Sequence, residues 1–396
     1  MSVGLWVRLI AWLIALLWGW KAVTSAVGLG RVPNLLRKDP SAAPVGEPML
    51  VVVIPARDEV ADIEACLRSL LAQDYGALHV VAVDDRSSDG TGALLDALAA
   101  EQGGSGRLSV LHVTELPEGW LGKTHAMAMA ARHAIAMYRP EYLLFSDADV
   151  LFTPDALRRG LAEAVETRAD HFVLSPTPIL GTVGEAVMLG FLQVMGLWAV
   201  RPWKVADGKA ESDAMGIGAF NLLRTEAYLA LGGFDALRLQ ILEDLTLARR
   251  VKQMGLRQRI AFGPGMVRLH WAAGVMGIVQ VMTKNLFAIF GFQTLRLVVA
   301  CGAFLVLCLG PFVGLAMTGT RVPSVLALGA IVWVYWVARG MGRIPAWTAV
   351  GFPFSVCLFV FSLLRSMAVT LRDGGVTWRG TFYPLKVLRK NVQLLR

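Results

Sequence analysis

The sequence predicts an α/β domain with a mostly parallel sheet, placed between apolar helical segments at both ends of the chain. Two observations support this prediction. Short apolar runs that suit buried strands alternate with helical segments between residues 49 and 271, a pattern typical of parallel sheets with right-handed crossovers. Hydrophobic residues make up 55% of the 396 residues and charged residues only 17%. Since this excess of apolar residues lies at the two ends, we expect N- and C-terminal transmembrane helices there.

The N-terminal segment from Leu5 to Trp20 is apolar except for Arg8. A cleaved signal peptide is one interpretation, but no clear small-residue cleavage site follows a basic start. We therefore expect an uncleaved anchor over residues 1–27. Four cations follow the apolar run and predict a cytoplasmic flank by the positive-inside rule: Lys21, Arg31, Arg37 and Lys38. Residues 28–48 end in a Pro/Ala-rich stretch and indicate a linker.

The spacing of hydrophobic residues predicts the strands and helices of the α/β region. Apolar runs predict strands at Leu50–Ile54, Leu78–Val83, Leu108–Val113 and Tyr142–Ser146. Helices are predicted at Ala61–Ala72, Gly90–Ala100, His125–Tyr138, Pro154–Thr167 and Leu245–Met254. In the first helix, Cys66, Leu67, Leu70 and Leu71 recur at helical spacing and mark its apolar face. Pro154 stands where prolines commonly start a helix.

The C-terminal region loses polarity after Trp271. Residues 272–296 carry a sparse polar stripe and predict a helix lying in the headgroup region. Transmembrane helices are expected within residues 297–370, at Leu297–Met317, Val322–Ala338 and Trp347–Leu364. Residues 371–396 form a basic interfacial tail, which contains Trp378 and Tyr383.

Three crossings after a cytoplasmic domain would put this basic tail outside, against the positive-inside rule. We expect the tail inside. One short segment would then be re-entrant, interrupted at Pro353, or the number of crossings differs by one.

Cysteine spacing and charge exclude several classes of protein. Cys66, Cys301, Cys308 and Cys357 show no C-x-x-C spacing, so neither a zinc site nor a disulfide framework is expected, which suits a reducing compartment. The net charge of +8 is spread along the chain. It predicts contact with anionic lipid headgroups of a bilayer and no nucleic acid.

Paired carboxylates follow two of the predicted strands. Asp147-Ala148-Asp149 comes directly after one, and Asp84-Asp85 after another. The carboxyl ends of parallel strands meet at the edge where open α/β sheets bind ligands. Carboxylate oxygens suit a hard divalent cation that bridges to phosphates. The two acidic strand ends therefore indicate a site for a nucleotide diphosphate with Mg²⁺ or Mn²⁺. A salt-bridged acidic loop is the alternative for the D-x-D.

Two further groups of charged residues stand at predicted helix starts. Lys123 follows Gly122, at an end that disfavours a cation. A bound diphosphate would remove that conflict, while a solvated surface lysine is the alternative. Glu243-Asp244 opens another helix, where capping alone explains two carboxylates. His125 and His133 lack ligand spacing, and we expect structural roles for them.

Several motifs occur in a defined order between Met49 and about Trp271. They are Ile54-Pro55-Ala56-Arg57-Asp58-Glu59, the loop from Asp84 to Thr91, Gly122-Lys123, the D-x-D, Gly232-Gly233-Phe234-Asp235 and Glu243-Asp244-Leu245. In this order the chain resembles family 2 glycosyltransferases of the GT-A fold, the fold of nucleotide-diphospho-sugar transferases. That likeness covers residues 49–271. The apolar ends are similar to a membrane-bound, lipid-glycosylating branch that includes hopanoid-associated and carotenoid glycosyltransferases.

The resemblance implies an inverting, metal-dependent enzyme of the inner cell membrane, multi-pass and with a cytoplasmic catalytic domain. It would transfer one sugar from a nucleotide sugar, a UDP-hexose, to a lipid acceptor such as a polyprenol, hopanoid or carotenoid. Donor-binding residues would be Pro55, Ala56, Glu59, Asp84, Asp85, Lys123, Asp147 and Asp149. Asp85 would recognise uracil, whereas the alternative role of a turn residue suits Asp89 better. For Arg57 and Asp58 a solvated loop is an equal alternative.

The resemblance also implies roles in chemistry. Asp244 would be the base that takes the acceptor proton, with Glu243 supporting it. Asp149 would bind the metal, and His270 would be a second ligand, although a histidine beside Trp271 also suits packing. Residues that shape the acceptor pocket would be Gly216, Gly218 and Asn221.

Other functions remain as alternatives. Processive polysaccharide synthases of this superfamily carry a Gln-x-x-Arg-Trp motif, for which His270-Trp271 is the nearest match, so single transfer is favoured. A non-catalytic membrane scaffold is disfavoured because Asp85, Asp147, Asp149 and Asp244 are all retained. A dinucleotide oxidoreductase is excluded because no G-x-G-x-x-G follows the first strand.

Overall fold

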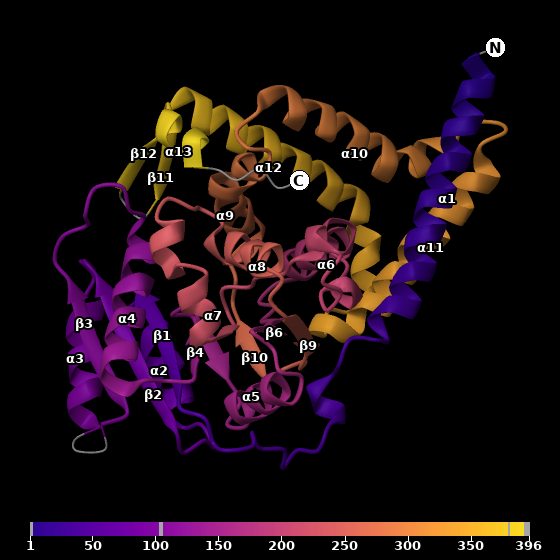
Figure 1. The fold of residues 1–396 in the computed structure, drawn as a ribbon. Helices are drawn as coiled ribbons and strands as arrows, with labels where there is room; N and C mark the ends of the chain where they lie inside the picture. The colour runs from indigo at the N-terminus through magenta and orange to yellow at the C-terminus, as the bar shows by residue number, and fades with distance from the viewer. Residues whose placement is uncertain (1–2, 103–105, 379–380, 392–396) are drawn as a thin grey trace. The chain divides into compact units, whose positions relative to one another are not determined.

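The computed structural model describes residues 3–102, 106–378 and 381–391 (Figure 1). Contacts divide the chain into two compact units, each assembled from segments far apart in the sequence. The sheet unit comprises Val32–Ile179 and Lys204–His270. The helical unit comprises Met1–Arg31, Leu180–Trp203 and Trp271–Arg396.

A seven-stranded sheet forms the centre of the sheet unit, in the order β3-β2-β1-β4-β8-β6-β9. Its strands are β1 (Leu50–Ala56), β2 (Leu78–Asp85), β3 (Leu108–Val113), β4 (Tyr142–Phe145), β6 (His171–Ser175), β8 (Asn221–Arg224) and β9 (Gln258–Phe262). The four strands from β3 to β4 are parallel neighbours, and β6 is parallel to β9. Strand β8 runs antiparallel to both β4 and β6. The mostly parallel α/β sheet is therefore confirmed.

Helices cover both faces of this sheet: α2 (Ile63–Leu71), α3 (Thr91–Glu101), α4 (Gly122–Tyr138), α5 (Ala156–Glu166), α7 (Thr225–Ala230) and α8 (Glu243–Gln253). Every residue of β1 and β2 is buried, as expected for parallel strands with helices on both faces. Alternate β1 residues separate into two cores. Val52 packs with Cys66 and Leu67 of α2, and Val51 packs with the alanines of α4.

A small second sheet extends from the end of β4. It contains β5 (Val150–Phe152), β10 (Val267–Leu269) and β7 (Thr177–Pro178), in the order β5-β10-β7. Strands β5 and β10 are antiparallel, and Val150 lies opposite Leu269. This pairing brings the residues just after the D-x-D next to the end of the sheet unit.

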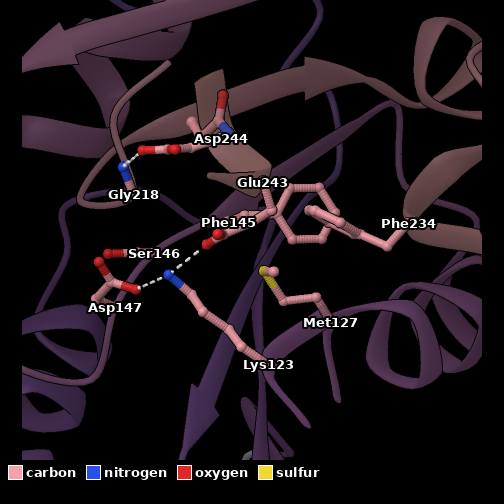
Figure 2. A pocket seen from close by; sticks show the side chains of 10 residues that line it. Lys123, Met127, Phe145, Ser146, Asp147, Gly218, Phe234, Glu243 and Asp244 are labelled. Carbon is pink, nitrogen blue, oxygen red and sulfur yellow. Dashed lines mark hydrogen bonds and ion pairs between the residues drawn. The ribbon is translucent and has the colours of Figure 1, made fainter. Parts of the chain in front are cut away.

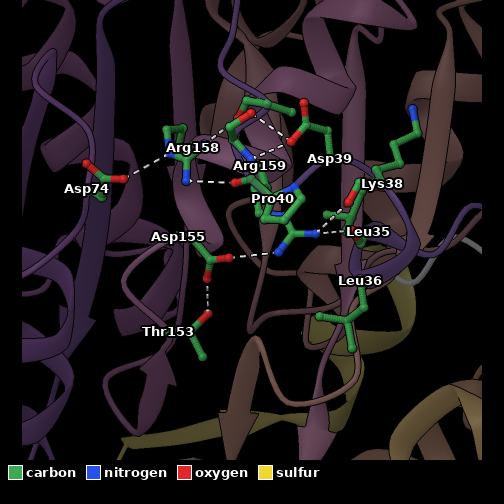
Figure 3. Close-up of polar contacts among 12 residues, drawn as sticks. Leu35, Leu36, Lys38, Asp39, Pro40, Asp74, Thr153, Asp155, Arg158 and Arg159 are labelled. Atoms are coloured by element: carbon green, nitrogen blue, oxygen red, sulfur yellow. Dashed lines mark hydrogen bonds and ion pairs between the residues drawn. The ribbon is translucent and has the colours of Figure 1, made fainter.

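The predicted linker is fastened to the sheet unit over much of its length (Figure 3). Two neighbouring arginines of α5 hold it. Arg158 donates to the carbonyl oxygens of Ala42 at 2.7 Å and Pro40 at 3.0 Å. Arg159 donates to the carbonyl of Leu35, in the short helix η1 (Leu35–Arg37), and pairs with Asp155 at 2.8 Å. The segment that enters the sheet unit is therefore held in place by specific side chains.

The helical unit contains the apolar helices α1 (Val3–Leu29), α6 (Val183–Ala199), α9 (Gly274–Ile289), α10 (Thr294–Leu315), α11 (Arg321–Gly342) and α12 (Phe352–Arg372). Among the described residues, five helical segments are long and apolar enough to span a membrane: Val3–Leu29, Val183–Lys204, Thr294–Leu315, Arg321–Gly342 and Ala346–Arg372. Four of them correspond to predicted spans. Helix α9 is shorter and occupies the segment predicted to lie at the interface.

The fifth apolar segment, helix α6, was not predicted. It lies inside the region assigned to the α/β domain, yet it packs within the helical unit, where Phe191 lies 5.7 Å from Phe352 and 5.6 Å from Phe359 between ring centroids. The chain before and after α6 belongs to the sheet unit. A single helix with both flanks in one compact unit cannot cross a bilayer once, so α6 is apolar because it packs among other helices.

Two details of the helical unit bear on the predicted spans. Pro353 lies in the first turn of α12, where its missing N–H costs no helical hydrogen bond, and just before it the chain changes from the 3-10 helix η6 (Ala346–Gly351) to α12. Lys21 is a buried part of α1 rather than a flanking cation, and its ammonium donates to the carbonyl of Leu197 at 2.7 Å.

The basic tail returns to the beginning of α10. It forms strands β11 (Gly375–Trp378) and β12 (Thr381–Pro384), which pair antiparallel, and then α13 (Leu385–Asn391). Arg389 of α13 donates to the carbonyl oxygen of Phe292 at 3.1 Å, two residues before α10. Helix α13 and the start of α10 therefore lie at the same end of the helical unit.

Candidate active site

A polar pocket at the carboxyl end of β4 gathers residues from five separate segments of the sheet unit (Figure 2). It is lined by Lys123, Met127, Phe145, Ser146, Asp147, Gly218, Asn221, Phe234, Glu243 and Asp244. The start of α4, the D-x-D loop and the start of α8 all meet here. These are segments in which the sequence predicted site residues.

Lys123 is the central cation of the pocket. Its ammonium lies 2.7 Å from a carboxylate oxygen of Asp147 and 2.7 Å from one of Glu243, as Figure 2 shows. Burial alone would lower the pKa of Lys123, but the two carboxylates raise it above its ordinary value. The side chain is 19% exposed. The alternative of a solvated surface lysine is therefore wrong, and Lys123 joins the D-x-D to the Glu243-Asp244 pair.

Asp244 is held by two backbone donors. One carboxylate oxygen accepts the N–H of Gly218 at 3.1 Å, and the other accepts the N–H of Leu245 at 2.7 Å. Burial, followed by the negative charge of Glu243, raises the pKa of Asp244 to about 7, while Lys123 opposes this rise. A carboxylate that titrates near neutral pH is suited to accept a proton. Its bond to Leu245 also satisfies one N–H of the first turn of α8, so capping and proton transfer are compatible.

Gly216 and Gly218 allow the chain to pass between two carboxylate residues. A Cβ on Gly216 would lie 2.0 Å from the carbonyl oxygen of Asp244, and one on Gly218 would lie 2.5 Å from a carboxylate oxygen of Asp147. Neither contact is sterically possible. The two glycines are therefore required by the close approach of Asp147 and Asp244.

A buried hydrogen-bond chain that the sequence analysis missed anchors the loop carrying these glycines. Gln258 accepts the N–H of Met215 at 3.1 Å and donates to Nδ1 of His171 at 2.7 Å. The other ring nitrogen of His171 donates to the side-chain oxygen of Asn221. Burial lowers the pKa of His171 to about 4 and keeps the ring neutral. Asn221 lines the pocket, yet its side-chain oxygen is engaged in this chain, which fixes both ends of the loop.

Asp85, the predicted nucleotide-binding carboxylate, is buried at the end of β2. It pairs with Arg86 at 2.8 Å and lies 3.9 Å from Arg57. It also lies against the start of α4, since a Cβ on Gly122 would be 2.2 Å from its carboxylate. No role was predicted for Arg86, and for Arg57 a solvated loop was an equal alternative to the nucleotide pocket. Their position beside Asp85 indicates that they orient it.

The other predicted donor residues lie on or after the first two strands. Pro55 and Ala56 are buried at the end of β1, and the N–H of Glu59 donates to Thr91 at 2.9 Å. Asp84 accepts the N–H of Ser87 at 3.0 Å and contacts His112 at 3.2 Å. These partners give Asp84 a role in shaping the turn.

The loops after β1 and β2 are interlocked. Asp58 accepts the N–H of Ser88 at 2.8 Å and donates its own N–H to Ser87 at 3.0 Å. Asp89 accepts the N–H of Thr91 at 2.9 Å, as its predicted turn role requires. Asp58 is an exposed loop residue, as the solvated-loop alternative predicted, and its hydrogen bonds join the two loops.

The carboxylates around Asp149 fit a divalent cation. Burial, followed by the charges of Asp147 and Glu59, raises the pKa of Asp149 to about 6, and a cation would relieve this repulsion. In the antiparallel ladder of β5 and β10, Val150 lies opposite Leu269. The same register continued by one residue places Asp149 opposite His270, which supports the prediction that these two residues bind one metal. In the described part of the chain, no three His, Cys, Asp or Glu residues are placed to hold a metal. Magnesium sites that use one or two carboxylates plus substrate phosphates need no such cluster.

Comparisons with known proteins found a matching family model and similar solved structures. Residues 51–228 match the family model described as "Glycosyl transferase family 2". The structure is similar to that of the mannosyltransferase PcManGT from Pyrobaculum calidifontis in complex with GDP-Man and Mn²⁺, with 22% identity over 93% of this chain and 99% of that chain, and a TM-score of 0.53. It is also similar to residues 1–349 of S. aureus TarS in complex with UDP, with 16% identity over 85% of this chain and 96% of that chain, and a TM-score of 0.42.

Proposed function

The chain belongs to glycosyl transferase family 2 and is a glycosyltransferase, and on this premise we propose that it transfers a single sugar from a nucleotide sugar to a membrane lipid. One observation carries the proposal. Lys123, Asp147, Glu243 and Asp244 meet in one pocket of the sheet unit, and the described part of the chain contains five helical segments long and apolar enough to span a membrane.

The donor side of the pocket is assigned to the ends of β1, β2 and β4. Asp85, oriented by its arginines, would accept hydrogen bonds from uracil, so we propose a UDP-hexose as donor. Asp147 would contact the ribose or the sugar. Lys123 is already positively charged between two carboxylates, and a diphosphate would compete with them for its ammonium.

A divalent metal is proposed as cofactor. Asp149 would hold it, with His270 as a second ligand, because these positions adjoin the paired residues of β5 and β10. A bound Mg²⁺ or Mn²⁺ would neutralise negative charge on the diphosphate.

The acceptor side is assigned to Asp244 and the glycine loop. Inversion at the anomeric carbon requires one base that takes the acceptor hydroxyl proton as the diphosphate leaves. The N–H groups of Gly218 and Leu245 fix the orientation of the Asp244 carboxylate. Glu243 has two effects. Its charge raises the pKa of Asp244, and its carboxylate holds Lys123 at 2.7 Å.

An assay with purified full-length protein tests this function. The protein is incubated with a membrane lipid extract, Mg²⁺ or Mn²⁺, and radiolabelled UDP-glucose, UDP-galactose, UDP-N-acetylglucosamine or GDP-mannose. We expect label from a UDP-sugar in the organic phase, in a product that mass spectrometry shows to carry one sugar. A ladder of added sugars would instead indicate a processive synthase. Neither transfer nor donor hydrolysis with any sugar would favour the scaffold.

We propose that the sheet unit and the basic tail face the cytoplasm of an inner cell membrane. Arg31 and Arg37 follow α1 at its connection to the sheet unit, as the positive-inside rule requires. The bond from Arg389 to Phe292 supports a tail on the side where α10 begins. A basic tail on the cytoplasmic side agrees with the positive-inside rule. The three apolar helices α10, α11 and α12 precede this tail, so they would not all cross the bilayer completely.

Cysteine labelling in intact cells checks this orientation. Cys357, an exposed thiol among the native cysteines, is first replaced by serine. In that background, a cysteine replacing exposed Ser88 should react with an impermeant maleimide only after the cells are permeabilised. A cysteine replacing exposed Thr318, in the turn between α10 and α11, is the control and should react in intact cells. Reaction of the Ser88→Cys variant from outside would reverse the proposed orientation.

A further inference from the structure

An apolar groove runs between α1 and α10 of the helical unit, with a volume of about 360 Å³. Val7, Ala11 and Ile14 line it from α1, and Leu305, Gly310 and Val313 are among the residues that line it from α10. Thr320 is the one polar side chain of the lining, and its hydroxyl is satisfied by the carbonyl of Gly314 at 2.7 Å. Ligand pockets commonly measure roughly 300–1,000 Å³. The groove therefore has the size and polarity of a site for a hydrocarbon chain.

Arg8 lies at one end of this groove. A Cβ built on Gly319 would be 2.6 Å from the guanidinium Nε of Arg8, so this group lies directly over Gly319. Gly319 precedes Thr320, which lines the groove. Arg8 is exposed, and within the part of the chain that the structure describes it has no hydrogen-bond or ion-pair partner. A guanidinium matches a phosphate group through two parallel hydrogen bonds.

The depth of this arrangement matches one leaflet of a bilayer. Helix α1 has 27 residues and is therefore about 40 Å long, against a hydrocarbon core of about 30 Å. About 5 Å then extends beyond the core at each end. Arg8, at about 7.5 Å from the first described residue, lies close to the headgroup boundary. Along α10, from Leu305 to Gly314, the groove is about 14 Å long, close to the half-thickness of about 15 Å.

We propose that α1 and α10, with Arg8, bind one anionic phospholipid. Arg8 holds the phosphate at the headgroup boundary, and one acyl chain fills the groove towards the middle of the membrane. The site lies at the end of α1 that is remote in the chain from the connection to the sheet unit, and the proposal does not rest on glycosyl transfer. Its occupant fills the gap that side chains leave between α1 and α10.

Native mass spectrometry of the full chain, titrated with phosphatidylglycerol or phosphatidylcholine in detergent, tests the site. We expect one phosphatidylglycerol to bind about fivefold more tightly than phosphatidylcholine, the usual effect of one arginine on an anionic lipid. Arg8→Gln should remove this preference, and Arg8→Lys should retain part of it. Arg296→Gln is the matched control, because Arg296 is an exposed arginine at the opposite end of α10.

Filling the groove provides the second arm of the test. Val313→Trp should weaken binding of both lipids about tenfold or more, because the indole occupies the space of the acyl chain. Val299→Trp is its control, since both valines are on α10 and both are 61% exposed, but Val299 is outside the groove. If Arg8→Gln and Arg296→Gln lose the preference for phosphatidylglycerol equally, the preference comes from general surface charge, and the site at Arg8 is excluded. Unchanged lipid binding by Val313→Trp would exclude the groove as the site.

Discussion

Replacing Asp244 by asparagine should lower the rate of sugar transfer by roughly two to four orders of magnitude, the usual contribution of a general base. Asparagine retains an oxygen that can accept the N–H of Gly218 or Leu245, and it caps helices about as well as aspartate. It cannot take a proton at neutral pH. Because the nucleotide is bound by the ends of β1, β2 and β4, donor affinity should change little. The measurement is the transfer rate beside the dissociation constant for UDP.

Asp235→Asn is the matched control, since Asp235 is an exposed aspartate whose partners are Arg132 and Arg238. It should transfer sugar at the normal rate. If Asp244→Asn transfers normally as well, Asp244 serves only in capping, and Glu243 becomes the remaining candidate for the base.

The same assignment determines the pH dependence. The pKa of Asp244 is raised to about 7, so below that pH the carboxylate is protonated and no longer accepts a proton. The value of kcat/KM should therefore fall about tenfold for each pH unit below 7. Lys123 lowers the pKa of Asp244, so Lys123→Met should move this limb of the profile to higher pH. If the acidic limb of the kcat/KM profile does not move in Lys123→Met, the group that titrates there is not Asp244 beside Lys123.

Replacing Asp149 by alanine should abolish activation by divalent metal and reduce transfer by about a hundredfold or more, because metal stabilisation of transition-state charge contributes several kcal/mol. A chelator should produce the same loss in the unaltered protein, and Mg²⁺ or Mn²⁺ should reverse it there but not in the variant. The measurement is the transfer rate as a function of metal concentration.

Because the pKa of Asp149 is raised, the pH dependence of metal activation is a second test of its role as a metal ligand. A ligand must be deprotonated to bind metal, and the pKa of Asp149 is about 6 without a cation. The metal concentration for half-activation should therefore rise as the pH falls below about 6. Asp62→Asn is the control, because Asp62 is an exposed neighbouring carboxylate without a proposed metal role. Full activity of Asp149→Ala with chelator present would remove the metal assignment.

The strands and the edge at which the site lies could be predicted from the sequence, because both follow from local patterns. β1, β2 and β4 are short apolar runs, as strands buried on both faces must be. Parallel strands end at one edge, so the acidic residues that follow them had to approach one another. The glycines at 216 and 218 could be named only through the resemblance, since nothing in their own segment shows that Asp147 and Asp244 lie against them.

Contacts between distant segments were decided by the tertiary structure. Lys123 is charged and half-buried because Asp147 and Glu243, which lie 24 and 120 positions further along the chain, meet it at 2.7 Å. His171 has no motif around it, and its role comes from Gln258 and Asn221 on two other strands. Such partners are brought together by packing, which a local pattern does not encode.

Helix α6 shows the same limit on a larger scale. Its composition resembles that of a membrane span, and an apolar run of this length is compatible with a buried helix or a crossing. Only the position of its two flanks in the sheet unit decides between them. Hydrophobic pattern thus specifies which residues leave water, because burial depends on each side chain. Tertiary structure specifies what they contact instead, because that depends on which segments pack together.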